Sequence, residues 1–202
     1  IALGVIELKR SSVSVSEGIR QNLDNQKKDF IRNFFTTMQL VMAGNDTQGV
    51  RYGTIETHEK YYLEWKEPAD PIHSDHVDLP SANLLDQHLA QLCSKARFLE
   101  LIHDFIVFDA GTKKTCRHNQ YFGIRAAKAY IRRRDGGIIW HTQGSGKSLT
   151  MVWLAKWIRE NVTDSRVLII TDRTELDEQI EKVFSGVEEE ILRTKSGADL
   201  VA

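Results

Sequence analysis

The most restrictive feature of the sequence is a glycine-rich turn between two apolar segments, within residues 136–155. The first apolar segment ends at Trp140, the turn carries Gly144 and Gly146, and the second segment begins at Leu149. Glycine lets the backbone curl until successive N–H groups face one point, and a helix that starts there adds the positive end of its dipole. This order of strand, turn and helix predicts a phosphate-binding loop. The alternative is an ordinary glycine turn followed by a solvated lysine.

The loop contains the residue types that a bound nucleotide requires. We expect Lys147 to contact the β- and γ-phosphates and Ser148 to hold Mg²⁺. His141 stands where the full pattern has its first glycine, a departure that a less tight first turn tolerates. The predicted nucleotide-binding residues of this segment are Thr142, Gln143, Gly144, Ser145, Gly146, Lys147, Ser148 and Leu149.

Composition places few limits on what the chain binds. Its 202 residues suffice for one large or two small domains, and its net charge of −1 gives no overall signature of nucleic-acid binding. The two cysteines, Cys93 and Cys116, are in no metal-binding spacing, which is typical of a reducing cytoplasm. No apolar run is long enough to span a membrane, so we expect a cytoplasmic protein without a membrane partner. Because the chain begins at Ile1 in a predicted strand, we expect a fragment of a longer protein.

Residues 4–10 alternate in the manner of a β-strand. This pattern places Glu7 and Lys9 on one face of the strand, with Ile6 and Leu8 on the other. On this evidence alone, an ordinary surface pair of opposite charges explains Glu7 and Lys9 equally well.

The rest of the N-terminal half predicts a mixed α/β unit. A Ser-rich turn and the spacing of Ile19 and Leu23 predict a helix that Ser14 or Ser16 caps. Further along, the patterns predict a short helix at 30–35, a buried strand at 39–43 and antiparallel strands at 52–57 and 61–65.

All three prolines fall within residues 68–80, a polar segment that predicts a loop between the two halves. His73 and His76 lie there among three aspartates, and a metal site is the alternative interpretation. No helix or pair of cysteines frames these ligands, so a solvated loop is preferred. Ser81 is predicted to cap a long helical pattern of leucines, and residues 105–108 follow as an apolar connection.

A run of eight basic residues without an acid extends from Lys113 to Arg134. Such a run usually forms a solvated helix face. Arg117 and Gln120 lie where this helix begins, and a glutamine amide has the donor and acceptor needed to read the edge of an adenine.

The segments after the glycine loop extend the same architecture. An apolar strand is predicted at 166–171, and a helix is predicted to begin within 172–179. Strand, phosphate loop, helix, strand and helix are the beginning of a doubly wound parallel sheet. No acidic pair follows a later strand, so we expect the fragment alone to hydrolyse a nucleotide poorly or not at all.

Three strings of residues together resemble one known family. Ile139-Trp-His-Thr-Gln-Gly-Ser-Gly-Lys-Ser-Leu-Thr150 looks like a Walker A segment, and Ile170-Thr-Asp-Arg-Thr-Glu-Leu-Asp177 is similar to helicase motif Ia. Val5-Ile-Glu-Leu-Lys9 looks like the second half of a PD-(D/E)xK nuclease motif. In this order, the strings resemble the restriction (motor) subunit of type I restriction-modification enzymes over essentially the whole chain.

The resemblance implies a role for the first strand and helix. Glu7 would ligate a catalytic Mg²⁺, and Lys9 would position the attacking water and steady the phosphate. The family also has a Gln-x-x-x-Tyr element on the next helix, in which Gln21 matches and Asn25 replaces the tyrosine. The essential aspartate of the family would lie before Ile1, so we expect the fragment alone to be inactive as a nuclease.

The resemblance also implies roles around the glycine loop. Arg117 and Gln120 resemble the adenine-reading element of such motors. The predicted DNA-contacting residues are Gln21, Thr171, Arg173 and Gln179. Capping of the following helix by Thr171 or Asp172 is the alternative.

We therefore predict an α/β chain with the remainder of a PD-(D/E)xK-type nuclease domain at 1–104 and the first half of a RecA-like P-loop parallel-sheet domain at 105–202. The resemblance implies part of an ATP-dependent DNA translocase and endonuclease. Its cofactors would be ATP and Mg²⁺, and its partners double-stranded DNA and the specificity and methyltransferase subunits. The alternatives are an ATP-dependent helicase or repair nuclease without these subunits, and a non-catalytic nucleotide-binding scaffold.

Overall fold

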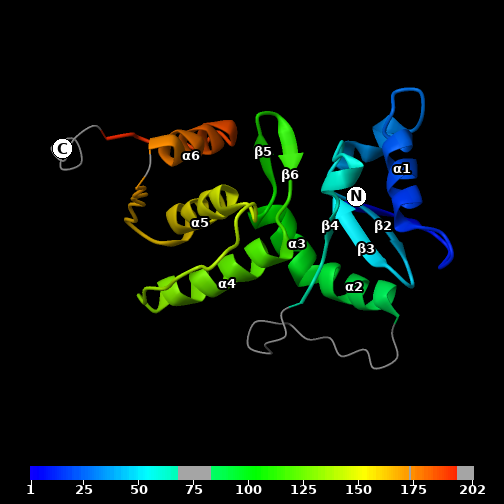
Figure 1. Ribbon diagram of the computed structural model, residues 1–202, viewed down its shortest axis with the longest axis horizontal. Helices are drawn as coiled ribbons and strands as arrows, with labels where there is room; N and C mark the ends of the chain where they lie inside the picture. The colour runs from blue at the N-terminus through cyan, green and yellow to red at the C-terminus, as the bar shows by residue number, and fades with distance from the viewer. Residues whose placement is uncertain (68–82, 173, 195–202) are drawn as a thin grey trace.

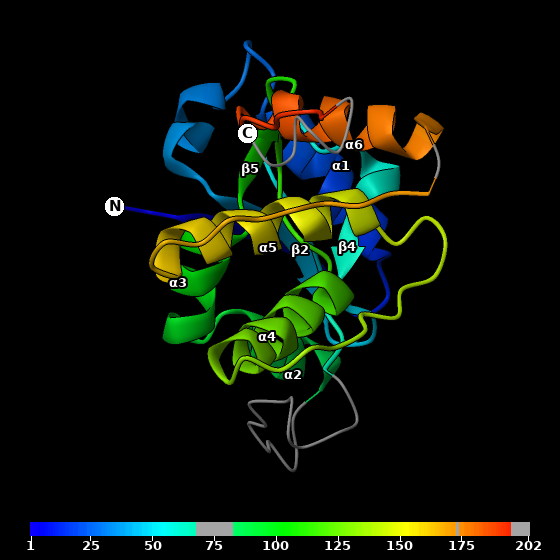
Figure 2. The same ribbon diagram turned by 90° about the vertical axis from the view of Figure 1, so that its left-hand side faces the viewer.

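The computed structural model describes residues 1–67, 83–172 and 174–194. A four-stranded sheet lies at one end of the molecule, and helices α5 (Lys147–Asn161) and α6 (Thr174–Gly186) lie at the other (Figure 1). Viewed from the second end, α4 (His118–Arg132), α5 and α6 are stacked in that order (Figure 2). The predicted mixed α/β class is confirmed.

The sheet contains strands β1 (Gly4–Leu8), β2 (Leu40–Asn45), β3 (Gly49–Gly53) and β4 (Leu63–Glu64), paired in that order. β1 and β2 are parallel, and the other two pairs are antiparallel. The connection from β1 to β2 contains helix α1 (Val15–Asn25) and the 3-10 helix η1 (Arg32–Thr37), while η2 (Glu59–Tyr61) precedes β4. The four predicted strands and both predicted helices of this region are confirmed, with shifted boundaries.

Alternation along the strands divides their side chains between the two faces of the sheet. On one face, Ala43 packs against Val15 and Ile19 of α1. Glu7 lies opposite Ala43 in the parallel register and therefore shares that face. Met42, on the other face, belongs to the main hydrophobic core. The predicted strand periodicity thus directs Glu7 toward α1.

The leucine-rich pattern after the loop forms two helices instead of one. Helix α2 (Leu84–Leu92) ends at Cys93, and α3 (Lys95–Asp104) begins after Ser94. Ser94 has extended backbone angles (φ −55°, ψ 137°), which interrupt a helix and start a new one. The predicted cap, Ser81, lies outside the described residues, as do His73, His76 and the rest of loop 68–80. Asn83 caps α2 by accepting a hydrogen bond from the Asp86 N–H.

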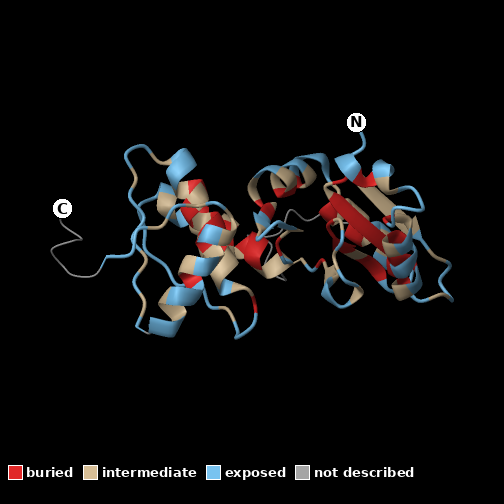
Figure 3. Cartoon of the chain, turned by 90° about the horizontal axis from the view of Figure 1, so that it is seen from above, coloured by how far each residue is buried: buried red, intermediate tan, exposed pale blue. Residues whose placement is uncertain are grey.

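Aromatic rings connect the sheet to the helices in one continuous core. Trp65, which follows β4, lies 5.3 Å from Tyr121 and 5.6 Å from Phe122 of α4, measured between ring centroids. Phe105 lies 5.2 Å from Tyr121 and 5.9 Å from Trp153 of α5. Tilted and edge-to-face contacts of this kind stabilise a core beyond the area that they bury. Figure 3 shows the buried residues on the strands at one end and on the helices at the other.

Residues 105–108, predicted as an apolar connection, instead lead into a hairpin. Its strands are β5 (Val107–Asp109) and β6 (Thr112–Lys114). The two turn residues, Ala110 and Gly111, have φ angles of 49° and 78°. Positive φ at both central positions suits the twist of a two-residue hairpin turn. The signal was weak in the sequence because only one of the two residues is glycine.

The parallel sheet predicted around the glycine loop is not formed by the described residues. Segments 137–141 and 166–171 are irregular, and neither belongs to one of the two sheets. Most of their apolar side chains face solvent, since Ile138 is 89%, Trp140 88% and Ile170 84% exposed, although Ile169 packs against the core of α5 and α6. Apolar patterning identifies a strand only where neighbouring strands supply backbone partners, and these segments have none in the structure. This expectation is therefore corrected.

No helix within the described ranges is long and apolar enough to cross a membrane.

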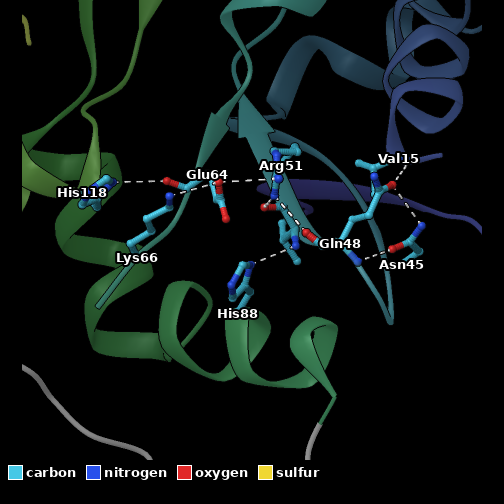
Figure 4. Close-up of polar contacts among 9 residues, drawn as sticks. Val15, Asn45, Gln48, Arg51, Glu64, Lys66, His88 and His118 are labelled. Carbon is cyan, nitrogen blue, oxygen red and sulfur yellow. Dashed lines mark hydrogen bonds and ion pairs between the residues drawn. The ribbon is translucent and has the colours of Figure 1, made fainter. Parts of the chain in front are cut away.

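His88 attaches α2 to the sheet through a backbone hydrogen bond (Figure 4). The Val50 N–H donates to His88 Nδ1 over 3.0 Å. A Cβ on Gly49, whose φ is +67°, would lie only 2.4 Å from the same nitrogen. Burial lowers the pKa of His88 below its ordinary value of 6.5. Only an unprotonated Nδ1 can accept this bond, so the fold requires neutral His88.

We predict that the free energy of unfolding decreases as the pH falls below about 6.5, the usual pKa of an unfolded histidine. The unfolded chain takes up a proton at a pH where folded His88 stays neutral, so protonation favours unfolding. Burial lowers the pKa of His118 as well, which adds to the same trend. Denaturant titrations between pH 8 and pH 5 should show that the free energy of unfolding depends less on pH in His88→Asn than in the wild type. The asparagine oxygen can replace Nδ1 as the acceptor. His58→Asn, on the exposed surface, is the control; equal slopes for His88→Asn and wild type would contradict the prediction.

Candidate functional site

Glu7, Lys9 and Gln21 converge at the end of β1. Lys9 Nζ lies 3.1 Å from Glu7 Oε1, and it donates a second, short hydrogen bond to Gln21 Oε1. The side chains of Lys9 and Glu7 remain 20% and 25% exposed, so solvent and ligands can reach the pair. The three residues predicted from the sequence are thus brought together by the fold.

Close packing of α1 on the sheet produces this convergence. A Cβ on Gly18 would lie 3.1 Å from Ala43 Cβ and 3.4 Å from the Glu7 carbonyl oxygen, so glycine permits the approach. Gln21 lies three residues further along α1 and therefore on the same side of the helix. Asn22 is buried, and its amide donates to the Met42 carbonyl over 2.8 Å, which fixes α1 to β2.

Glu7 offers a single carboxylate to a divalent cation. Within the ranges that the structure describes, no group of three or more His, Cys, Asp or Glu side chains is placed to hold a metal ion. Mg²⁺ usually keeps several waters and takes only one or two carboxylates from a protein. Glu7 can therefore serve as one ligand of Mg²⁺, but the described residues do not supply the full set of ligands.

The glycine-rich segment forms a turn that leads directly into α5. Gly144 and Gly146 have φ angles of 75° and 87°, in the left-handed region that favours glycine. The N–H and the hydroxyl of Ser145 both donate to the Thr142 carbonyl, over 3.3 and 2.7 Å. Lys147 opens α5, and its Nζ donates back to the same carbonyl over 3.1 Å. The ammonium group therefore lies over the turn that precedes it.

The start of α5 suits an anion such as a phosphate. Gly146 occupies the N-cap position and provides no side-chain hydrogen bond to the first N–H groups of the helix. These groups lack partners within the helix and carry its positive dipole end. Ser148 lies half-buried in the first turn of α5, Gln143 is exposed in the turn that precedes it, and Leu149 packs against the main core. The loop residues predicted to bind nucleotide are therefore placed around one helix N-terminus.

Arg117 and Gln120 hold the glycine turn from the start of α4. Gln120 Nε2 donates to the Gly146 carbonyl over 2.9 Å, and its Oε1 accepts from the Arg117 N–H over 2.8 Å. The Arg117 guanidinium donates to the Gly144 carbonyl over 3.1 Å. Gln120 is only 2% exposed. Both ends of its amide are occupied within the protein, and adenine recognition by this residue stays a prediction.

The basic run on α4 is only partly the solvated face that the sequence predicts. Lys128 is 6% exposed, and its ammonium lies 2.6 Å from Asp104 and 3.7 Å from Glu100 of α3. The guanidinium of Arg132 covers the ring of Trp157 at 5.3 Å. Acids from a neighbouring helix, which sequence spacing does not reveal, neutralise the inner part of this face.

A short segment connects the sheet directly to Arg117 and Gln120. The Tyr52 hydroxyl, on β3, donates to the Cys116 carbonyl over 2.9 Å. Thr54 donates to the Lys113 carbonyl over 2.6 Å, and Lys113 Nζ donates to Gln39 Oε1 over 2.6 Å. The residues that precede α4 are thus bonded to the sheet that carries Glu7.

The predicted DNA-contacting residues are not gathered in one place. Gln21 lies beside β1, whereas Gln179 is exposed on α6 at the opposite end of the molecule (Figure 1). Thr171 lies half-buried in the irregular segment before α6. Arg173 is outside the described residues. Their role in DNA contact stays a prediction.

Sequence reasoning missed the polar contacts that hold the connection between β1 and α1. Asn45, the last residue of β2, and Gln48, in the turn that follows, hydrogen-bond to this connection. From Gly44-Asn-Asp46 the sequence indicated only that a turn follows the buried strand. Nothing in the local pattern reveals that its amides reach a loop more than thirty residues earlier.

Two family models match the chain. The family described as Type I restriction enzyme R protein N terminus matches residues 1–60, which contain Glu7, Lys9 and Gln21. The family described as SWI2/SNF2 ATPase matches residues 119–202, which contain Gln120 and the glycine loop.

Relatives of the chain are endonuclease subunits of type I restriction enzymes. The MjaIXP subunit assigned to Methanocaldococcus jannaschii is 35% identical over 57% of this chain and 12% of its own length. The HindI subunit of Haemophilus influenzae is 26% identical over 96% of this chain and 20% of its own length. The SsaAORF53P subunit of Staphylococcus saprophyticus is 23% identical over 97% of this chain and 21% of its own length. The chain is thus related to these subunits, as the sequence predicted, and spans between 12% and 21% of them.

We predict that Gly146→Ala lowers the free energy of unfolding by about 1–2 kcal/mol, the usual cost of a left-handed conformation for a residue with a Cβ. The new Cβ would also lie 2.4 Å from Gln120 Nε2, so the contact between α4 and the turn must shift. Denaturant unfolding measures this loss. Gly136→Ala is the matched control, because no atom lies within 4 Å of a Cβ there. Equal stabilities of the two variants would contradict the observed loop geometry.

Proposed function

We propose that the chain is part of the restriction subunit of a type I restriction-modification complex, an enzyme that moves double-stranded DNA at the expense of ATP and cleaves it. One observation carries the proposal: Glu7, Lys9 and Gln21 converge within the segment that matches the type I restriction enzyme R protein N terminus. A glycine turn with a lysine over it lies within the segment that matches an ATPase family. The specificity and methyltransferase subunits are the proposed partners of the whole protein.

The nuclease half of the proposal assigns separate tasks to three side chains. Glu7 would hold Mg²⁺, which supplies positive charge to the phosphate as negative charge develops on it. Lys9 would orient the attacking water or a phosphate oxygen, because its ammonium lies at the same point as the carboxylate. Gln21 fixes Lys9 from α1 through its hydrogen bond. Asn25 stands where the family has a tyrosine, and it has no phenol. We therefore assign no role in DNA positioning to this residue.

The motor half assigns the glycine loop to ATP. The N–H groups at the start of α5 and Lys147 would bind the phosphates, and Ser148 would hold the accompanying Mg²⁺. Lys147 already lies near the turn, so it needs only to exchange the Thr142 carbonyl for a phosphate oxygen. Arg117 and Gln120 would keep Gly144 and Gly146 in the required conformation, with adenine contact as a second task.

We propose a nuclease unit at 1–104 and a motor unit at 105–202. The two family matches support this division because one ends before residue 104 and the other begins after 105. A parallel pair of strands connected through α1 supports a PD-(D/E)xK-type unit. Support for a RecA-like unit comes from the order of loop and helix and from the ATPase match.

In the whole protein, Lys9→Ala should reduce DNA cleavage by roughly 100-fold or more, the scale on which one charge-stabilising group acts. ATP turnover should stay at the wild-type rate, because Lys9 does not contact the glycine loop. Cleavage of plasmid DNA and release of phosphate measure the two activities in the same sample. Lys28→Ala, an exposed lysine beyond α1, is the control. If Lys9→Ala cleaved DNA at the normal rate, the nuclease assignment would be wrong.

Lys147→Ala should remove ATP turnover, DNA movement and cleavage together, because cleavage by the proposed enzyme depends on the motor. A triplex-displacement assay follows DNA movement alongside the two other activities. Lys156→Ala tests for a general effect of charge, since Lys156 lies on the same helix away from the turn. ATP turnover that persists in Lys147→Ala would overturn the motor assignment, and an equal loss in Lys156→Ala would mean that the effect of Lys147 is only one of general charge.

A further inference from the structure

We infer that Asn45 and Gln48 are positioning residues for the nuclease site, because they hold the connection that sets Lys9 against Gln21. This inference rests on the proposed nuclease function. Residues 10–14 connect the end of β1, where Lys9 lies, to the start of α1, which carries Gln21. The shape of this connection therefore determines how the two side chains meet.

The connection has little core of its own. Arg10, Ser11, Ser12 and Ser14 are exposed, and Val13 is half-buried. Its internal hydrogen bond runs from the Val13 N–H to the Arg10 carbonyl over 2.8 Å. Apolar burial does not fix such a segment, so contacts with neighbouring elements must do so.

Gln48 holds the start of α1. Its Oε1 accepts a hydrogen bond from the Val15 N–H over 2.7 Å and a longer one from Asn45 Nδ2 over 3.3 Å (Figure 4). Val15 is the first residue of α1, so Gln48 satisfies an N–H that has no partner inside the helix. Gln48 therefore acts as a helix cap supplied from a different part of the sequence.

Asn45 holds the middle of the connection. It is 1% exposed, and Nδ2 donates to the Val13 carbonyl over 2.7 Å. Oδ1 accepts from the Gln48 N–H over 2.7 Å and from the Thr47 hydroxyl over 3.2 Å. A buried amide with all of these bonds made is confined to one orientation.

The same turn is also fixed to the strand that carries the site. The Lys9 N–H donates to the Gly44 carbonyl over 2.9 Å, one residue before Asn45. Ser11 Oγ donates to Asp46 over 3.2 Å, and the Thr47 hydroxyl, which shares its one proton between two acceptors, lies 3.3 Å from the Ser11 carbonyl and 3.2 Å from Asn45 Oδ1. Both ends of the connection, at Lys9 and at Val15, are thus hydrogen-bonded to the same hairpin, formed by β2 and β3.

Precision of this kind matters for the proposed chemistry. Catalytic groups must lie within about 0.5 Å of their productive positions, and a misplacement of about 1 Å can reduce a rate by roughly 100-fold. Release of α1 from Gln48 would let Gln21 move relative to Lys9, although neither side chain changes. The turn would thereby affect the cleavage step more than the binding of DNA.

Two substitutions at Gln48 test the inference in the whole protein. Gln48→Met keeps the length of the side chain but removes the acceptor. Gln48→Glu keeps an acceptor oxygen, and a carboxylate at a helix N-terminus is favourable. We expect Gln48→Met to lower the cleavage rate at saturating DNA by roughly 10-fold or more, with unchanged DNA affinity and ATP turnover. Gln48→Glu should cleave at close to the wild-type rate.

Gln26→Ala controls for lost stability. Gln26 is a buried amide on the residue after α1, and its Oε1 accepts from the Glu56 N–H over 2.6 Å. Its removal destabilises the same unit but leaves the connection at 10–14 intact. Denaturant unfolding places the variants on a common scale of stability. The inference requires Gln48→Met to lose more cleavage than Gln26→Ala at equal or higher stability.

The outcomes separate this inference from the proposed function. If Glu7→Gln and Lys9→Ala cleave DNA normally, the nuclease assignment itself fails. If those variants are inactive while Gln48→Met cleaves like wild type, the positioning role alone is overturned. Equal loss of cleavage in Gln48→Met and Gln48→Glu would also overturn it, because the acceptor oxygen would then be irrelevant.

Discussion

The position of helix α4, which holds the glycine turn, depends on the buried contact between Trp65 and this helix. Arg97, from α3, lies within this contact, with its guanidinium 5.2 Å from the Trp65 ring and 5.5 Å from the Tyr121 ring. Its charge is balanced by Glu67, which also accepts a hydrogen bond from the Trp65 indole over 2.8 Å. A buried charge is tolerated only with such a partner, and loss of either member leaves the other uncompensated. The ion pair and the rings together fix the sheet, α3 and α4 relative to one another.

This fixed arrangement brings the two candidate sites into one framework. Tyr52 of β3 and Thr54, just after this strand, bond to the segment that leads into α4, and Gln120 of α4 bonds to the glycine turn. A continuous series of hydrogen bonds therefore connects the sheet that carries Glu7 to the loop that carries Lys147. The two sites lie in different family matches and are held by different cores: α1 packs on Ala43 beside Glu7, whereas α4 and α5 pack in the main core beside the glycine turn.

The sequence predicted those features that local chemistry determines. Alternation at 4–10 predicted the strand and the shared face of Glu7 and Lys9, and the Ser-rich turn predicted the helix that brings Gln21 to them. Features that depend on distant partners were not predictable. The reach of Gln48 to Val15 and the burial of Lys128 against Asp104 arise from packing, and the apolar run at 166–171 has no strand partner in the structure. Apolar patterning shows what a segment prefers, whereas pairing depends on which neighbours are present.

We propose that Glu7 and the glycine loop belong to two separate sites for a divalent cation in one protein. The most direct test replaces Mg²⁺ with Fe²⁺ in the whole protein bound to DNA and a non-hydrolysable ATP analogue. Hydroxyl radicals generated at the iron then cut the backbone beside each metal, and mass spectrometry locates the cuts. We predict one set of cuts around Glu7, lost in Glu7→Gln, and another around Ser148, lost when the analogue is omitted. Cuts at neither position, or cuts at Glu7 that persist in Glu7→Gln, would rule out this pair of metal sites.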